Sequence, residues 1–136
     1  METKKIKIGE IVEFLDSKIP LHWQESYDNA GLLYGHKEMD CTGIYICFDM
    51  NCQVIENAIK NNCNFVLSHH PLVYKSLRKF TSEDNVTATL LKAIKNNYFN
   101  EKLIKLWHLL YLFNSKLLSI QKSSYNSDYL FVRHFE

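Results

Sequence analysis

The sequence predicts an α/β fold built on a partly parallel sheet. Apolar residues recur at intervals of three and four between Ile8 and Ile19, which is typical of a helix with one buried face. The stretches 43–48 and 65–67 are rich in strand-forming residues, and the segment between them has helical periodicity. Strand, helix and strand in such close succession predict a crossover that joins parallel strands. A chain of 136 residues is also long enough to bury one core.

The first expected helix ends before Pro20, since proline cannot continue a helix. Its apolar face consists of Ile8, Ile11, Val12, Leu15 and Ile19.

Residues 21–30 show neither helical nor strand periodicity, and they predict an ordered loop that enters an edge strand at 31–35. The loop contains His22, Glu25 and Asp28, each of which could be a ligand or a base. The alternative is that they are solvated polar groups, because such residues are also common in turns.

The crossover is expected to begin with a central strand at 43–48, which Asp49 closes. Asn51 is a suitable N-cap for the helix that follows, and the polar pair at 61–62 is a suitable stop. The expected buried face of this helix consists of Val54, Ile55, Ala58 and Ile59.

Two adjacent imidazoles, His69 and His70, follow the second parallel strand and precede the turn at Pro71. In open α/β sheets ligands collect at this carboxyl edge. Neighbours on an extended chain point to opposite faces, so the pair would serve two ions or be kept together by the turn. The alternative is one hydrogen-bonded core histidine and one surface histidine. Asp49 opens onto the same edge and could be a ligand, a partner that orients an imidazole, or a helix cap.

Beyond the histidines, Lys75, Arg78 and Lys79 could meet a phosphate group or simply be solvated. A further helix is expected to start at 82–85. Its expected inward residues are Val86, Leu90, Leu91, Ala93 and Ile94. From residue 98 the character changes, because 103–113 is apolar with little alternation and no glycine or proline occurs after Pro71.

Composition excludes several classes of protein. The formal net charge of +1 gives no strong signal for nucleic acid or an anionic membrane. No leader-like or membrane-spanning apolar run is seen, so we expect a cytosolic protein. The four cysteines form no Cys-x-x-Cys pair, and we expect reduced, mostly buried thiols.

Two longer motifs, QESYDNAGLLYG at 24–35 and SHHPLVYKSL at 68–77, resemble the Nif-three-like family, whose members are also called GTP cyclohydrolase 1 type 2 homologues. The likeness runs from about Ile6 through Asn97 and then stops. It implies a three-layer α/β domain that binds two divalent metal ions (zinc, manganese or iron) and assembles into homo-oligomeric, hexameric rings. His69 and His70 would then each supply one metal ligand.

The rest of the ligand set that the resemblance implies is not recognisable in the sequence. The family has an aspartate in a His-Thr-Asn-Leu-Asp-like segment and a His-x-x-x-Glu pair near the end of a longer chain. His108 is followed four residues later by Leu112, and His134 and Glu136 are only two residues apart. We therefore divide the chain into residues 1–97, the N-terminal part of a Nif-three-like domain, and a divergent tail at 98–136. The domain is expected to be truncated, or altered by a frameshift.

The resemblance, together with the ligands that the sequence lacks, leaves three candidate functions. The first is a metal-dependent hydrolase that acts on a nucleotide-like small molecule, incomplete in this chain. The second is a non-catalytic metal-binding or protein-interaction module. The third is an inactive truncated remnant.

Overall fold

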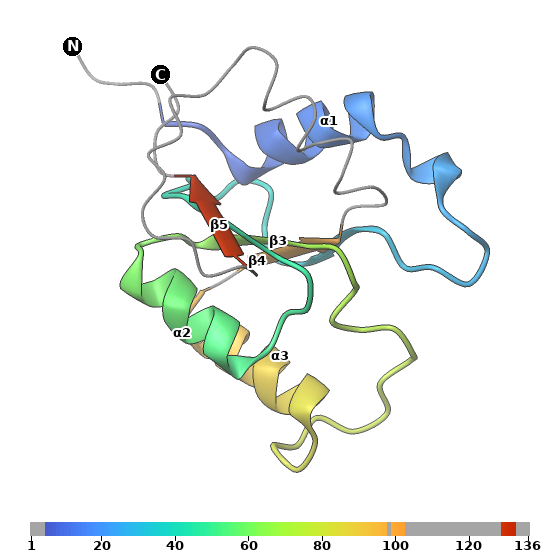
Figure 1. Ribbon diagram of the computed structural model, residues 1–136, viewed down its shortest axis with the longest axis vertical. Coiled ribbons are helices and arrows are strands. Elements are labelled where there is room, and N and C mark those ends of the chain that lie inside the picture. The colour runs from blue at the N-terminus through green and yellow to red at the C-terminus, as the bar shows by residue number, and fades with distance from the viewer. Residues whose placement is uncertain (1–4, 98, 103–128, 133–136) are drawn as a thin grey trace.

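A computed structural model describes residues 5–97, 99–102 and 129–132 as an α/β domain of three layers (Figure 1). Helix α1 covers one face of a five-stranded sheet, and helices α2 and α3 cover the other. In chain order the elements are α1 (Ile8–Lys18), the 3-10 helix η1 (Leu21–Trp23), β1 (Gly31–Tyr34), β2 (Ile44–Cys47), α2 (Cys52–Lys60), β3 (Phe65–Ser68), α3 (Asn85–Lys95), β4 (Phe99–Lys102) and β5 (Tyr129–Val132). None of the helices within these ranges has the length and apolar character of a membrane-spanning segment.

The sheet is partly parallel, as predicted. Its strand order is β1-β4-β3-β2-β5. Strands β2, β3 and β4 run parallel, and β1 and β5 pair antiparallel with β4 and β2 respectively. The register of β2 with β3 begins with Ile44 opposite Phe65 and ends with Cys47 opposite Ser68. Every residue of both strands is buried, which is expected of parallel strands covered on two faces.

Helix α1 packs on the sheet through the apolar face that its sequence predicts. The five predicted residues are all buried and contact the side chains of β2 and β3 that point toward this helix, Ile44, Ile46, Phe65 and Leu67. At the start of the helix the Glu10 side chain accepts a hydrogen bond of 3.1 Å from the Lys7 amide. This contact pairs a backbone N–H group at the start of the helix that has no partner within the helix itself.

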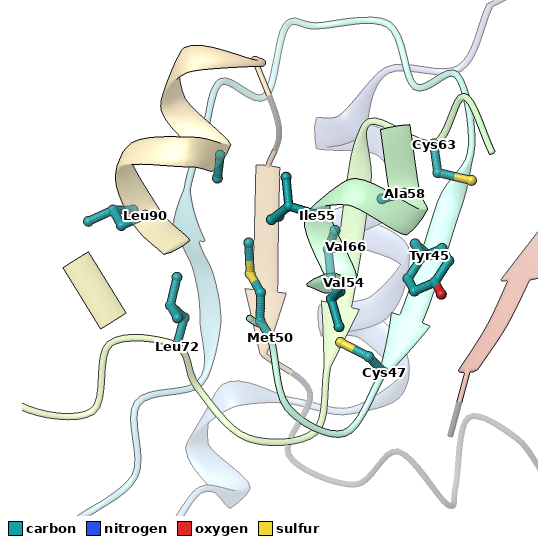
Figure 2. Packing of buried hydrophobic residues seen from close by; sticks show 11 residues of the cluster. Tyr45, Cys47, Met50, Val54, Ile55, Ala58, Cys63, Val66, Leu72 and Leu90 are labelled. Carbon is teal, nitrogen blue, oxygen red and sulfur yellow. The ribbon is translucent and has the colours of Figure 1, made fainter. Parts of the chain in front are cut away.

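The second core lies between the sheet and helices α2 and α3 (Figure 2). The predicted cap of α2 is confirmed, because the Asn51 side chain accepts a 2.9 Å hydrogen bond from the Val54 amide. Met50 precedes this cap, and Leu72 comes from the chain that follows the histidines. Both are buried in the cluster (Figure 2). The core thus anchors the chain after β2 and the chain after β3.

Three predicted core positions are wrong. Ile59, Leu91 and Ile94 are exposed, whereas Thr87 and Thr89 are buried. Helix α3 can bury these threonines because its own first turns satisfy the hydroxyls. Thr87 bonds to the Asp84 carboxylate that caps the helix, and Thr89 donates to the Asn85 carbonyl at 2.7 Å. The buried face of α3 therefore runs through Thr87, Thr89, Leu90 and Ala93, which leaves Leu91 and Ile94 on the solvent side.

Two strands were not predicted, and both come from beyond residue 97. Strand β4 lies between β1 and β3, although its sequence, FNEK, contains a single apolar residue. Strand β5 pairs with β2, so the expected divergent tail contributes to the same sheet. The apolar stretch 103–113 and the residues His108, Leu112, His134 and Glu136 lie outside the described residues.

Phe65 tests the assignment of the core. The side chain is fully buried against α1, so Phe65→Ala is expected to lower the free energy of unfolding by about 3 to 5 kcal/mol. Phe14→Ala removes the same side chain from an exposed position of α1 and should cost less than about 1 kcal/mol. Urea unfolding of both variants measures the difference, and equal losses would contradict this packing.

Candidate metal site

The His69-His70 pair is held at the carboxyl end of β3 by continued pairing with β2. The His69 amide donates to the Cys47 carbonyl at 3.0 Å, and the His70 amide donates to the Phe48 carbonyl at 2.9 Å. The backbone of both histidines is therefore fixed by the sheet, although β3 itself ends at Ser68.

Alternation along a regular strand would place successive side chains beyond the ends of β2 and β3 on opposite faces. Extending the register by two residues sets Phe48 opposite His69 and Asp49 opposite His70. The observed contacts agree. The rings of Phe48 and His69 meet edge to face with centroids 5.8 Å apart, and Nδ1 of His70 lies 2.8 Å from Oδ1 of Asp49. The Asp49–His70 pair is exposed to solvent, with side chains 72% and 60% accessible.

The two imidazoles nevertheless lie side by side. Their ring centroids are 4.6 Å apart and the ring planes are tilted by 51°. The bend of the chain before Pro71 thus keeps the rings together, which is one of the two arrangements that the sequence left open. His69 is only partly exposed and its Nδ1 atom is buried, so a ligand would approach His69 through Nε2.

The two sequence motifs meet next to this pair. The Asn29 side-chain amide donates a 2.7 Å hydrogen bond to the Val73 carbonyl, across 44 residues of sequence. Within the first motif, the Ala30 amide donates to the Gln24 side chain at 3.0 Å. In Figure 1 the loop after α1 and the loop after β3 extend from the same side of the sheet. The sequence indicated Asn29 only as a turn residue beside Asp28 and as part of a longer motif, and it did not predict the contact with Val73.

The other polar residues of the first loop do not join the histidines in a ligand cluster. His22 and Glu25 are exposed, and Asp28 accepts a 2.8 Å hydrogen bond from the amide of Asn29. Within the ranges that the structure describes, no group of three or more His, Cys, Asp or Glu side chains is arranged to hold a metal ion. The described site therefore consists of two imidazoles and one associated carboxylate.

The cysteines lie apart from this chemistry. All four are free thiols, as predicted; Cys47 and Cys63 are buried, and Cys41 and Cys52 are partly buried. Burial raises the pKa of Cys47 to about 12 and the pKa of Cys41 to about 11. Both thiols are therefore protonated at neutral pH, whereas a metal ligand must be a thiolate.

The donor set fits the beginning of a transition-metal site. Imidazole nitrogen is a good ligand for zinc and iron, whereas manganese prefers carboxylates. Two neutral imidazoles supply half of the four ligands of a typical structural zinc site. The described residues thus fit a divalent ion in part and do not complete its coordination.

The fold and the site define an α/β protein with a histidine pair at the carboxyl edge of a mixed sheet. The family described as Duf34/NIF3 (NGG1p interacting factor 3) matches residues 6–99. The chain belongs to this family, as the two motifs suggested.

Named relatives agree with this assignment. A GTP cyclohydrolase 1 type 2 homolog of Staphylococcus epidermidis is 39% identical over 92 residues, covering 68% of this chain and 25% of the relative. The protein of the same name from Clostridium acetobutylicum is 30% identical over 92 residues, covering 68% of this chain and 34% of the relative. This chain thus matches between a quarter and about a third of these relatives' length.

Solved structures share the fold. A hypothetical protein of Staphylococcus aureus superposes with a TM-score of 0.70 at 28% identity, covering 74% of this chain and 28% of that one. A NIF3-related protein of Bacillus cereus gives a TM-score of 0.70 at 25% identity, with the same coverage. HcgD from Methanocaldococcus jannaschii, in its reduced form, gives 0.66 at 27% identity and covers 74% of this chain and 40% of that one.

Proposed function

We propose that this chain binds a divalent metal ion through His69 and His70, and that it contributes these ligands to a metal-dependent hydrolase centre acting on a nucleotide-like substrate. The observation that carries the proposal is the side-by-side placement of the two imidazoles, 4.6 Å apart, at the carboxyl end of β3. A bound ion would polarise a substrate oxygen or a water molecule. Zinc, manganese and iron are the candidate ions, with the two imidazoles favouring zinc or iron.

The substrate proposal rests on the two loops that meet at the Asn29–Val73 hydrogen bond. The second loop exposes Lys75, Arg78 and Lys79, and within the described residues none of these cations forms an ion pair. Four aromatic side chains of the two loops are at least half exposed: Trp23, Tyr27, Tyr74 and Phe80. Cations recognise phosphate and aromatic rings stack on planar bases, so together they suit a nucleotide-like molecule.

A non-catalytic metal-binding or interaction module is the second candidate function. It is favoured by the donor set, because the described residues offer two imidazoles and no third ligand. An inactive remnant is the third possibility. We also propose homo-oligomer formation on the basis of the family resemblance, and size-exclusion chromatography with light scattering would test it.

Metal titration separates these functions. Calorimetry with zinc and manganese on the purified chain distinguishes two tightly bound equivalents, as the two-metal centre implied by the family resemblance would give, from one weak equivalent, as expected of a two-imidazole module. Absence of binding would identify a remnant and would overturn the proposed function.

The double variant His69→Ala/His70→Ala is expected to abolish this binding and to leave the chain folded, because both side chains lie at a strand end and not in either core. The matched control is His22→Ala/His36→Ala, which removes two exposed imidazoles that form no ligand cluster within the described residues and should bind metal as the parent does. Circular dichroism checks the fold of each variant. Metal binding that survives the first change, or is lost with the second, would disprove the site.

The loop cations are tested by Lys75→Gln/Arg78→Gln/Lys79→Gln. Three exposed contacts to phosphate of about 0.5 kcal/mol each correspond to roughly a tenfold loss of affinity for a nucleoside triphosphate. The loss should shrink as salt is raised, since exposed charges are screened. The control Lys18→Gln/Lys60→Gln/Lys95→Gln removes the same charge from three helix ends and should leave affinity unchanged. Equal effects of the two triple variants would show that only net charge matters.

We further expect no measurable opening of the GTP ring by this chain, with or without added zinc or manganese. Ring opening requires an ion and a water molecule held rigidly against the purine, and the described residues supply only two of the necessary ligands. Formate release from GTP is the measurement. Release that depends on metal and disappears in His69→Ala would restore a complete enzyme.

A further inference from the structure

We propose that Asp49 is a positioning residue that fixes the tautomer and orientation of His70, so that Nε2 is the nitrogen that His70 offers to a metal ion. The proposal rests on the metal-binding role proposed above, and it adds the role of a residue that is not itself a ligand. Its basis is the 2.8 Å contact between Oδ1 of Asp49 and Nδ1 of His70.

The geometry arises from the sheet. Asp49 lies two residues after Cys47, His70 lies two residues after Ser68, and Cys47 and Ser68 are directly opposite each other in the parallel register. The backbone bond from His70 to Phe48 extends that register to the pair itself. The register therefore brings Asp49 and His70 opposite each other, and the bend at residues 69–70 leaves their side chains in contact.

The other two roles that the sequence allowed for Asp49 fit less well. Asn51 fills the role of helix cap, since its side chain accepts the hydrogen bond from the Val54 amide at the start of α2. A role as ligand beside His70 conflicts with the contact to Nδ1. Oδ1 of Asp49 contacts Nδ1, which lies on the other side of the His70 ring from Nε2. An ion bound at Nε2 is therefore out of reach of this oxygen.

Hydrogen-bond chemistry then decides the tautomer. An ionised carboxylate can only accept hydrogen bonds, so Nδ1 of His70 must carry the proton, and Nε2 of the neutral ring keeps its lone pair. His69 would also be approached through Nε2, because its Nδ1 is buried. Both rings would therefore present the same nitrogen, one oriented by packing and the other by a carboxylate.

The contribution is one of orientation more than of stability. Both partners are largely exposed to solvent, where such pairs add little to the stability of a fold. By contrast, removing a carboxylate that orients a metal-binding imidazole typically lowers metal affinity by about 10 to 100-fold.

The test compares Asp49→Ala with Asp49→Asn. Asparagine can accept the Nδ1 proton through its oxygen or donate its amide N–H to an unprotonated Nδ1, so it no longer forces one tautomer, and alanine can do neither. Long-range nitrogen–proton correlation spectra of the metal-free chain, recorded at about pH 8.5 where ordinary imidazole is neutral, report the His70 tautomer directly. We expect the Nδ1–H form in the parent, a mixture of both forms in Asp49→Asn, and a shift toward the Nε2–H form in Asp49→Ala.

Zinc affinity provides the second measurement. It should fall by about 10 to 100-fold in Asp49→Ala and by clearly less in Asp49→Asn. Glu13→Ala, which removes an exposed carboxylate of α1, is the control and should change neither the tautomer nor the affinity.

Two results would overturn the positioning role. One is an unchanged tautomer and affinity in Asp49→Ala. The other is an equally complete loss of zinc binding in both Asp49 variants with an unchanged tautomer, which would make Asp49 a direct ligand. The tautomer is measured on the metal-free chain, so this measurement does not depend on metal binding. If the parent chain binds no ion, the proposed function fails, and the spectra alone decide whether Asp49 fixes the tautomer of His70.

Discussion

The parallel register of β2 with β3 is the constraint on which the site depends. Cys47 lies opposite Ser68, and the same register brings Asp49 opposite His70 two residues later. A slip of one residue would exchange the two faces of β3 and would move His70 away from the carboxylate. Such a slip is strongly opposed, because both strands are buried on both faces and every side chain would enter the wrong core. The packing of the sheet thus sets the geometry of a group that is itself exposed.

The segments that leave these strands are also held by the core. Met50 directly follows Asp49, Leu72 lies two residues after His70, and both are buried against α2 and α3. The Asn29–Val73 hydrogen bond then ties the loop of the first motif to the second. A site precise enough for chemistry needs supports of this kind, because ligands on free loops would be displaced by thermal motion. Here His69, His70 and Asp49 each lie within two residues of a buried anchor.

The sequence predicted the helices and the parallel pair because their apolar periodicity is strong, and the five buried positions of α1 are the clearest case. The prediction from sequence failed where tertiary contacts outweigh the local apolar pattern. Strand β4 has a polar sequence and forms because β1 and β3 pair with it on both sides. Alternation alone could not show that the rings of His69 and His70 meet, since that depends on the bend before Pro71. It also left three roles open for Asp49, which only the observed register and the Asn51 cap can separate.

The charge of the proposed site favours an anionic ligand. Two neutral imidazoles add no negative charge to a divalent ion, and the carboxylate of Asp49, which contacts His70, would offset only part of the ion's charge. The neighbouring loop adds the exposed cations Lys75, Arg78 and Lys79. An ion held by His69 and His70 would therefore keep part of its positive charge. Oxygen atoms of a phosphate group could neutralise that charge and occupy coordination positions that the described residues leave open. The incomplete protein ligand set and the preference for a phosphorylated molecule would then have the same electrostatic origin.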